Sequence, residues 1–211
     1  GKLEEAEASY KKAIALKPDF AEAHSNIGAL FYDLGKLQEA EASCRKAIAL
    51  NPNNAEAHSN LGVTLKDLGR LEEAEASYAQ AVVLKPDYAD AHYNLGNTLQ
   101  ELGRLEEAEA SYRQTIALKP DFAEAHGNLG NLLQELGRLE EAEASYTQAI
   151  ALKPDYAEAH SNFGTTLKEL GRLDESEESL RQAIALKTDF AEPHNNLGIT
   201  FQELGRFEEA E

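Results

Sequence analysis

The sequence has 211 residues, one cysteine and a formal net charge of −18, from 20 Lys and Arg against 38 Asp and Glu. This acidic balance repels phosphate backbones and acidic lipid headgroups, so we expect no nucleic-acid binding and no membrane association. A single cysteine excludes a disulfide within the chain, and no apolar run is long enough to span a bilayer. We therefore expect a cytoplasmic protein.

The same phrase returns every 34 residues, most cleanly as AEAHGNLGNLLQELGRLEEAEASYTQAIALKPDY at 123–156. A fixed period of this length predicts a stacked-repeat solenoid, in which each unit buries its apolar face against its neighbours. We expect one array over 1–211 without an internal domain boundary. The full copies cover 21–54, 55–88, 89–122, 123–156 and 157–190, and the partial copies cover 1–20 and 191–211.

Each copy is predicted to contain two helices, and positions are counted from the alanine that opens the copy. The first helix of copy 123–156 carries an apolar stripe at Ala125, His126, Leu129, Gly130, Leu133 and Leu136. Asp121 and Glu124 predict a capping box at its start, and Gly137 predicts its end. The stripe of the second helix comprises Leu139, Ala142, Tyr146, Ala149 and Ile150. Pro154 ends this helix.

Small side chains at Gly130, Ala142 and Ala149 allow two helices joined by a tight turn to approach closely. With Pro154, they carry a resemblance to the tetratricopeptide repeat (TPR) family that covers all 211 residues. The resemblance implies an all-α fold, a right-handed superhelical α-solenoid of helix-turn-helix units. The chain departs from the family pattern in having His at position 4 of every copy, and Thr188 where the other copies have Pro.

In TPR proteins the stripe at positions 2, 5, 6, 9, 12 and 13 of the first helix lines a concave groove. Here position 6 is always asparagine, namely Asn26, Asn60, Asn94, Asn128, Asn162 and Asn196. An amide donates and accepts hydrogen bonds, which suits contact with a peptide backbone. The series resembles the TPR region of O-linked N-acetylglucosamine transferases, where such asparagines hold the substrate peptide. The alternative is that each asparagine only bonds to the neighbouring first helix.

The other groove positions vary, and this variation is expected to set the specificity for a peptide. The further candidates for peptide contact are Tyr93, Asn97, Asn131, Lys66 and Lys168. Positions 2 and 13 are acidic throughout. The lysine at position 5 that chaperone-binding TPR proteins use for a terminal carboxylate is absent from every copy. A chaperone C-terminus is therefore a poor candidate ligand.

We find no sequence motif for catalysis, and we expect neither an enzyme activity nor a cofactor in these residues. All six histidines occupy position 4, one repeat apart, which is too far to share a metal ion. They are His24, His58, His92, His126, His160 and His194. Each is expected to be partly buried where the two helices of a repeat meet.

The first expectation for function is a protein-interaction scaffold that binds a peptide segment in the groove. One alternative is the substrate-recognition arm of a larger transferase, such as a glycosyltransferase. Another is a self-assembling structural array, because 1–20 lacks its first helix and 191–211 lacks most of its second. End-to-end self-association between these two segments would cover the apolar faces that they expose.

Overall fold

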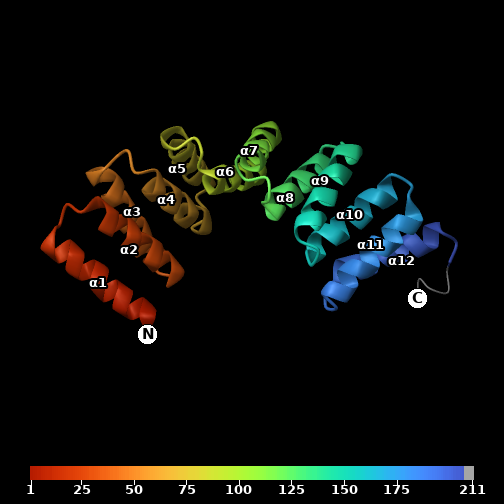
Figure 1. The fold of residues 1–211 in the computed structure, drawn as a ribbon, viewed down its shortest axis with the longest axis horizontal. Coiled ribbons are helices and arrows are strands. Elements are labelled where there is room, and N and C mark those ends of the chain that lie inside the picture. Colours follow the sequence, from red (N-terminus) through yellow and green to blue (C-terminus); the bar gives the residue numbers. More distant parts are fainter. Residues whose placement is uncertain (207–211) are drawn as a thin grey trace. The chain divides into compact units, whose positions relative to one another are not determined.

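The computed structural model of the chain describes residues 1–206, which form twelve helices and no strand (Figure 1). The first helices of the copies, called A helices, are α2 (Ala21–Asp33), α4 (Ala55–Asp67), α6 (Ala89–Glu101), α8 (Ala123–Glu135), α10 (Ala157–Glu169) and α12 (Ala191–Glu203). The second helices, called B helices, are α1 (Lys2–Leu16), α3 (Leu37–Leu50), α5 (Leu71–Leu84), α7 (Leu105–Leu118), α9 (Leu139–Leu152) and α11 (Leu173–Leu186). The predicted all-α repeat fold is confirmed. The second helix expected after α12 would fall mainly on 207–211, which lie outside the described residues.

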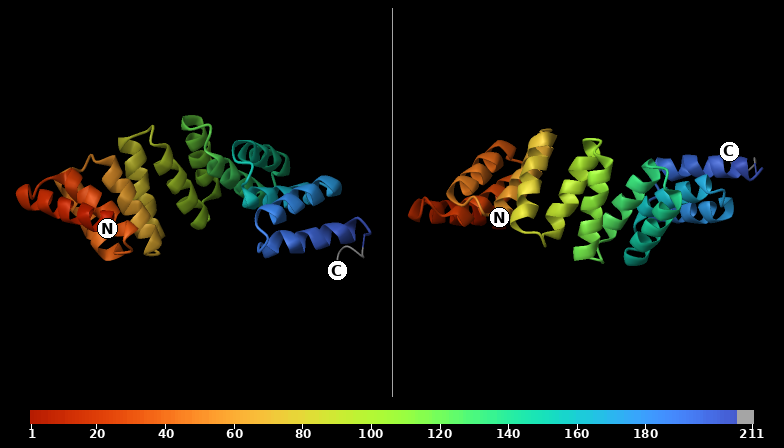
Figure 2. Two further views of the ribbon diagram at one scale, coloured as in Figure 1. Left: turned by 60° about the horizontal axis from the view of Figure 1, so that its bottom comes forward. Right: turned by 90° about the horizontal axis from the view of Figure 1, so that it is seen from above.

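The chain forms two compact units, Gly1–Gln114 and Thr115–Glu211, and the division falls within α7. In the first unit, α2 packs against α3 and α4 against α5 (Figure 1). In the second unit, α8 packs against α9 and α10 against α11 in the same way. Within each unit, B helices also contact the next A helix, as α3 contacts α4 and α11 contacts α12 (Figure 2). Successive helix pairs therefore pack against one another within each unit, as a repeat fold requires.

The C-terminal ends of the A helices follow from local backbone chemistry, whereas the predicted N-terminal cap does not form. Gly137 has φ of 70°, a left-handed conformation that favours glycine, and the next N–H, of Arg138, donates to the Leu133 carbonyl at 2.8 Å. The predicted end at Gly137 is confirmed. The predicted capping box at Asp121 is wrong, because the cap residue of α8 is Phe122, which supplies no side-chain bond.

An aromatic residue takes the cap position in most copies and packs instead of capping. The Phe122 ring lies beneath the Lys119 ammonium, with 4.6 Å between Nζ and the ring centre. Asn54 occupies the same position before α4, and there its Oδ1 accepts a hydrogen bond from the Ala57 N–H at 3.0 Å. The one copy with a capping residue type at this position therefore has the side-chain cap.

The core of each repeat lies between its A and B helices, where small residues let the backbones approach. A Cβ added at Gly130 would lie 2.7 Å from Tyr146 Cε1, closer than real Cβ contacts come. Tyr146, Ala142 and Ala149 are fully buried. This contact confirms the packing reason for the small residues.

In copy 21–54 a cysteine takes the place of this tyrosine. Cys44 is fully buried against Gly28, and burial raises the pKa of its thiol to about 12. Cys44 is therefore a small core residue.

Candidate peptide-binding face

The candidate site is the face formed by positions 2, 6, 9, 12 and 13 of the A helices, called here the A face. On α8, positions 3, 7, 8 and 11 are buried, while the A-face positions 6, 9 and 12 are half-buried and 13 is exposed. Helical periodicity thus separates a core stripe from a polar stripe on one helix. Position 5 belongs to neither set in most copies, because Ser25, Ser59, Gly127 and Ser161 are all buried. Position 9 therefore presents more of the variable side chains than position 5 does.

The position-6 asparagines Asn60, Asn162 and Asn196 bond to the preceding A helix. Asn162 Nδ2 donates to Asn131 Oδ1 at 2.7 Å, and Asn196 Nδ2 donates to Thr165 Oγ1 at 3.1 Å. Asn60 Nδ2 donates to Ser25 Oγ at 3.5 Å, the long limit for such a bond. Neighbour bonding, the alternative reading of the asparagine series, is therefore present at these positions. Of the others, Asn26 is exposed, and Asn94 and Asn128 are half-buried.

The hydroxyl groups of two buried tyrosines donate hydrogen bonds to two of the position-9 asparagines. The Tyr146 hydroxyl lies 2.8 Å from Asn131 Oδ1, although the ring of Tyr146 is fully buried. The Tyr112 hydroxyl lies 2.8 Å from Asn97 Oδ1 in the same way. Burial raises the pKa of Tyr146 above its ordinary value, so the hydroxyl keeps its proton and donates. The core of the repeat therefore orients amides on the A face.

Positions 12 and 13 form a second series of bonds between successive A helices. Lys66 Nζ pairs with Glu101 at 2.7 Å, and Gln134 Nε2 donates to Glu169 at 3.2 Å. In the first copy, the Tyr32 hydroxyl donates to Asp67 at 2.7 Å, and this bond is the main reason that the pKa of Tyr32 rises to about 12. The predicted candidate Lys168 is half-buried in α10 and pairs with no acid of the described chain.

A depression of about 420 Å³ lies on the A face of the second unit. It is lined by Asn131, Gln134, Glu135, Asn162, Thr165, Glu169 and Glu192. It brings together two predicted residues, Asn131 and Asn162. The other lining residues were not predicted individually as peptide contacts, although they occupy positions 2, 9, 12 and 13 of the predicted stripe. This regular spacing is the signal that could have found them.

The remaining predicted residues are not part of the lining of this depression. Tyr93 is half-buried in the first unit, and its ring centre lies 6.2 Å from that of Tyr112. Asn97 and Lys66 also lie in the first unit, on α6 and α4. Tyr93 therefore packs within its own repeat. Asn97 and Lys66 make the polar contacts with Tyr112 and Glu101 described above.

The position-4 histidines connect each A helix to the segment before it. His160 Nε2 lies 3.1 Å from the Pro154 carbonyl oxygen, and four other copies have the same contact. A carbonyl only accepts, so Nε2 must carry a proton, as it does in both the neutral Nε2–H tautomer and the cation. Where Thr188 replaces proline, His194 is exposed and makes no such bond. Each of these histidines therefore bonds its A helix to the turn that connects it to the preceding repeat. The expected position between the A and B helices of the same repeat is not where this bond forms.

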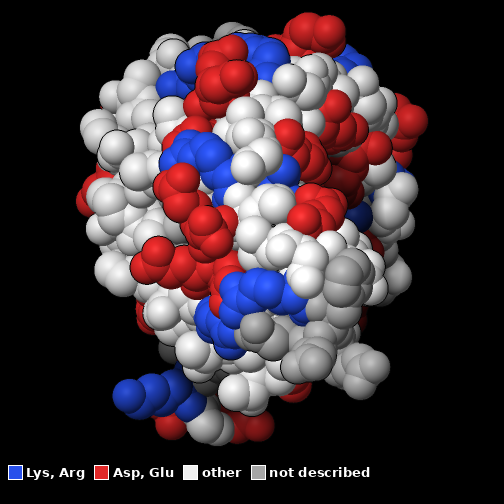
Figure 3. Space-filling view, turned by 90° about the vertical axis from the view of Figure 1, so that its right-hand side faces the viewer, with Lys and Arg blue, Asp and Glu red and all other residues white. Residues whose placement is uncertain are grey.

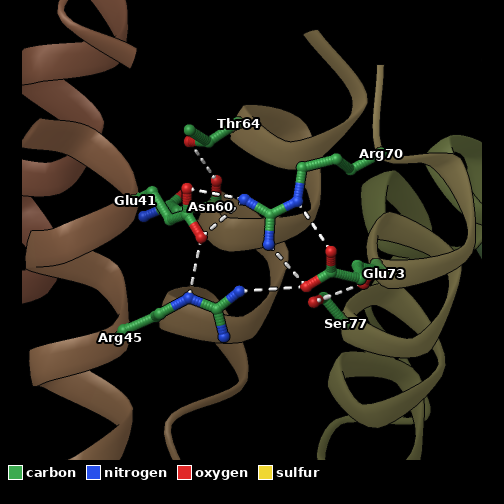
Figure 4. Close-up of polar contacts among 7 residues, drawn as sticks. All are labelled: Glu41, Arg45, Asn60, Thr64, Arg70, Glu73 and Ser77. Atoms are coloured by element: carbon green, nitrogen blue, oxygen red, sulfur yellow. Dashed lines mark hydrogen bonds and ion pairs between the residues drawn. The ribbon is translucent and has the colours of Figure 1, made fainter. Parts of the chain in front are cut away.

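A cluster of ion pairs lies where the second full copy meets the first (Figure 4). Arg70 pairs with Glu41 at 2.8 Å and with Glu73 at 2.6 Å, and Arg45 reaches the same two carboxylates at 2.8 and 3.1 Å. The hydrogen bond from Arg70 is the main reason that the pKa of Glu73 lies below its ordinary value. Figure 3 shows Lys and Arg beside Asp and Glu on the end of the molecule that it views. Many basic groups are therefore paired on the protein itself.

The described part of the chain offers no group of three or more His, Cys, Asp or Glu side chains that could hold a metal ion. None of the helices in 1–206 has the length and apolarity that a bilayer crossing requires. The chemistry available on the A face is hydrogen bonding by amides, hydroxyls and carboxylates.

Comparison with solved structures places the fold among known repeat proteins. YrrB, a TPR protein with an unusual peptide-binding site, is 24% identical over 87% of this chain and 95% of its own, with a TM-score of 0.76. MamA is 27% identical over 78% of this chain and 96% of its own, with a TM-score of 0.73. PilF of Pseudomonas aeruginosa is 17% identical over 100% of this chain and 89% of its own, with a TM-score of 0.79. No curated protein matches the sequence significantly.

Family models for the TPR match the sequence along most of its length. The model described as TPR repeat matches residues 1–35, 64–103 and 164–205. Models described as tetratricopeptide repeat match residues 21–54, 93–157, 43–76 and 145–178. The chain therefore belongs to the tetratricopeptide repeat family.

Proposed function

We propose that the chain is a protein-interaction scaffold that binds an extended peptide segment on its A face. The observation that carries the proposal is the polar depression of the second unit, into which side chains of three successive A helices project. A peptide crossing this depression would meet amides and carboxylates at each repeat. The acidic net charge disfavours nucleic acid as the ligand.

Bonding between neighbouring helices leaves the amides of the depression able to bind a backbone. Asn162 uses one N–H on Asn131, so its second N–H and its Oδ1 can pair with the C=O and N–H of a peptide. Asn131 Oδ1 lies near both Asn162 and Tyr146, which orients the Asn131 NH2 group. A fixed amide loses less side-chain entropy on binding than a mobile one does. We therefore infer that the neighbour bonds prepare the asparagines for a ligand.

Proteins of the same fold include YrrB, which carries a peptide-binding site. The asparagine series resembles the TPR region of certain glycosyltransferases. A substrate-recognition arm of a larger transferase would use the A face in the same way. The two proposals differ in what else the gene encodes. A transferase domain in the same reading frame would favour the recognition arm.

The test is binding of an extended peptide library to the wild-type chain and to Asn162→Ala and Asn131→Ala. Loss of one hydrogen bond between uncharged groups costs about 0.5–1.5 kcal/mol, so each variant should bind selected peptides roughly 2- to 13-fold more weakly. The matched control is Gln148→Ala, a change at an exposed helical position of α9 outside the A face. If all three variants bind the peptides as tightly as the wild-type chain does, with unchanged circular dichroism, the A face is not the binding surface.

A further inference from the structure

A second surface recurs on the side of the repeats formed by the B helices. In the first unit, a crevice of about 400 Å³ lies between α3 and α5, with Ile48 and Leu61 in its lining. In the second unit, a crevice of about 440 Å³ lies between α9 and α11, with Ile150 and Phe163 at the same repeat positions. Both volumes lie in the range of ligand sites, about 300–1,000 Å³.

The first-unit crevice has an arginine on its rim. Arg45 stands at position 25 of its copy, and its guanidinium bonds Glu41 on its own helix at 2.8 Å and Glu73 on the next B helix at 3.1 Å (Figure 4). Glu73 also accepts two hydrogen bonds from Arg70. Two arginines thus neutralise two carboxylates at this edge of the crevice.

The second-unit crevice has the same acids but lacks this arginine. Thr147 occupies the position of Arg45, and its hydroxyl donates to the Glu143 carbonyl of its own helix at 2.8 Å. Glu175, the counterpart of Glu73, accepts two bonds from Arg172 and none from the preceding B helix. Arg172 also bonds Glu143 at 2.6 Å. A single arginine therefore pairs with both carboxylates at this crevice.

The rim of the second-unit crevice carries a further acid. Glu178 lines the crevice at position 22, is exposed and has no ion-pair partner in the described structure. The other copies have alanine there, namely Ala8, Ala42, Ala76, Ala110 and Ala144. Ala79 in copy 55–88 also replaces the rim arginine, but the next copy has Ala110, without the added carboxylate. The combination of a missing arginine and an added acid is confined to the crevice between α9 and α11.

We propose that this crevice binds an arginine side chain supplied by a partner protein. The guanidinium would take the position relative to Glu175 that Arg45 takes relative to Glu73, with Glu178 as a second acceptor. The aliphatic stem and an adjacent apolar residue would lie on Ile150, Phe163 and Leu167. The fork of the guanidinium matches carboxylates better than an ammonium does, so arginine is preferred to lysine. A single pair with exposed carboxylates is weak, so the site is an anchor within a larger contact.

The test uses three peptides, acetyl-Leu-Arg-Leu-amide and its Lys and Gln counterparts, titrated into the isotope-labelled chain and followed by NMR. We expect the Arg peptide to shift the signals of Phe163 and Glu178 in a saturable way, the Lys peptide to bind more weakly and the Gln peptide not to bind. Equal shifts with the Gln peptide would overturn the proposal. Shifts spread evenly over both crevices would also overturn it.

The variant Thr147→Arg supplies the arginine from the chain itself. It should retain the melting temperature, because Arg45 is accommodated at the same repeat position. It should weaken binding of the Arg peptide by up to about fivefold, because it occupies the carboxylates that the peptide would use. Glu178→Gln, at an exposed position, should weaken the peptide without changing the fold. The reciprocal change Arg45→Thr tests whether the rim arginine excludes a ligand. Undiminished binding by both Thr147→Arg and Glu178→Gln would refute the crevice as the site.

Discussion

The close contact between Gly130 and Tyr146 makes a prediction about stability that depends on a single methyl group. A Cβ at Gly130 would lie 2.7, 2.9 and 2.8 Å from Cε1, Cζ and Cδ1 of Tyr146. The ring is fully buried, and its hydroxyl is held by Asn131 and Gln134 at 2.8 and 3.1 Å. The ring therefore has no low-energy position into which it can move.

Two terms of opposite sign set the expected size of the effect of Gly130→Ala. Overpacking in a close-packed core costs about 1–3 kcal/mol, and a held ring places this site in the upper part of that range. Replacing glycine by alanine inside a helix contributes about 1 kcal/mol in favour of the variant. The free energy of unfolding should therefore fall by about 1–2 kcal/mol, which corresponds to a melting temperature lower by about 2–8 °C for a chain of this size.

The assay is urea and thermal unfolding followed by circular dichroism, in a double-mutant cycle with Tyr146→Ala. Removing the ring removes the clash, so Gly130→Ala should stabilise the Tyr146→Ala background through helix propensity alone. The sign of the effect should thus reverse between the two backgrounds. If Gly130→Ala destabilises both backgrounds equally, the close approach to Tyr146 is not the reason for glycine at this position.

Three further predictions test the contacts of buried side chains. Tyr146→Phe should lower the free energy of unfolding by about 1 kcal/mol through loss of the bond to Asn131. Tyr78 is buried as well, but its hydroxyl has no such hydrogen bond within residues 1–206, so Tyr78→Phe should change the free energy of unfolding by under about 0.5 kcal/mol. Equal effects of the two changes on urea unfolding would contradict this reasoning. The buried Ser161 hydroxyl has no partner in the described chain, so Ser161→Ala should stabilise by about 1 kcal/mol, and a lower thermal midpoint would refute it. Cys44, with its pKa raised to about 12 by burial, should stay unreactive to a disulfide reagent at pH 8 until urea unfolds the chain, and rapid reaction when folded would contradict its burial.

The position-6 asparagines show why a contact within the protein and a contact with a ligand are not exclusive. Asn162 spends one of its two N–H donors on Asn131 and keeps a donor and an acceptor for other partners. The bond also ties α8 to α10, two A helices of the second unit. Loss of Asn162 should therefore affect ligand affinity and the packing of these helices together, and for this reason the binding test includes a fold control.

Much of the fold was predictable because its determinants are local. The 34-residue period, the glycine at Gly137 and the apolar stripes each act within a few residues or between adjacent helices, and the structure has helices where they predict them. The capping box was the exception, since Asp121 has the right residue type but Phe122 takes the cap position. Residue type alone did not decide the register of the turn.

The sequence by itself determined the repeat, its two helices and the polar stripe that carries the asparagines, because a helix turns periodicity along the chain into a face in space. The partners of those side chains depended on the tertiary structure, because Asn162 and Asn131 are separated by 31 residues and meet only when α8 and α10 pack together. The same holds for the crevice between α9 and α11. Glu178 is a single substitution in the sequence, and only the packing of α9 and α11 brings it into one crevice with Ile150.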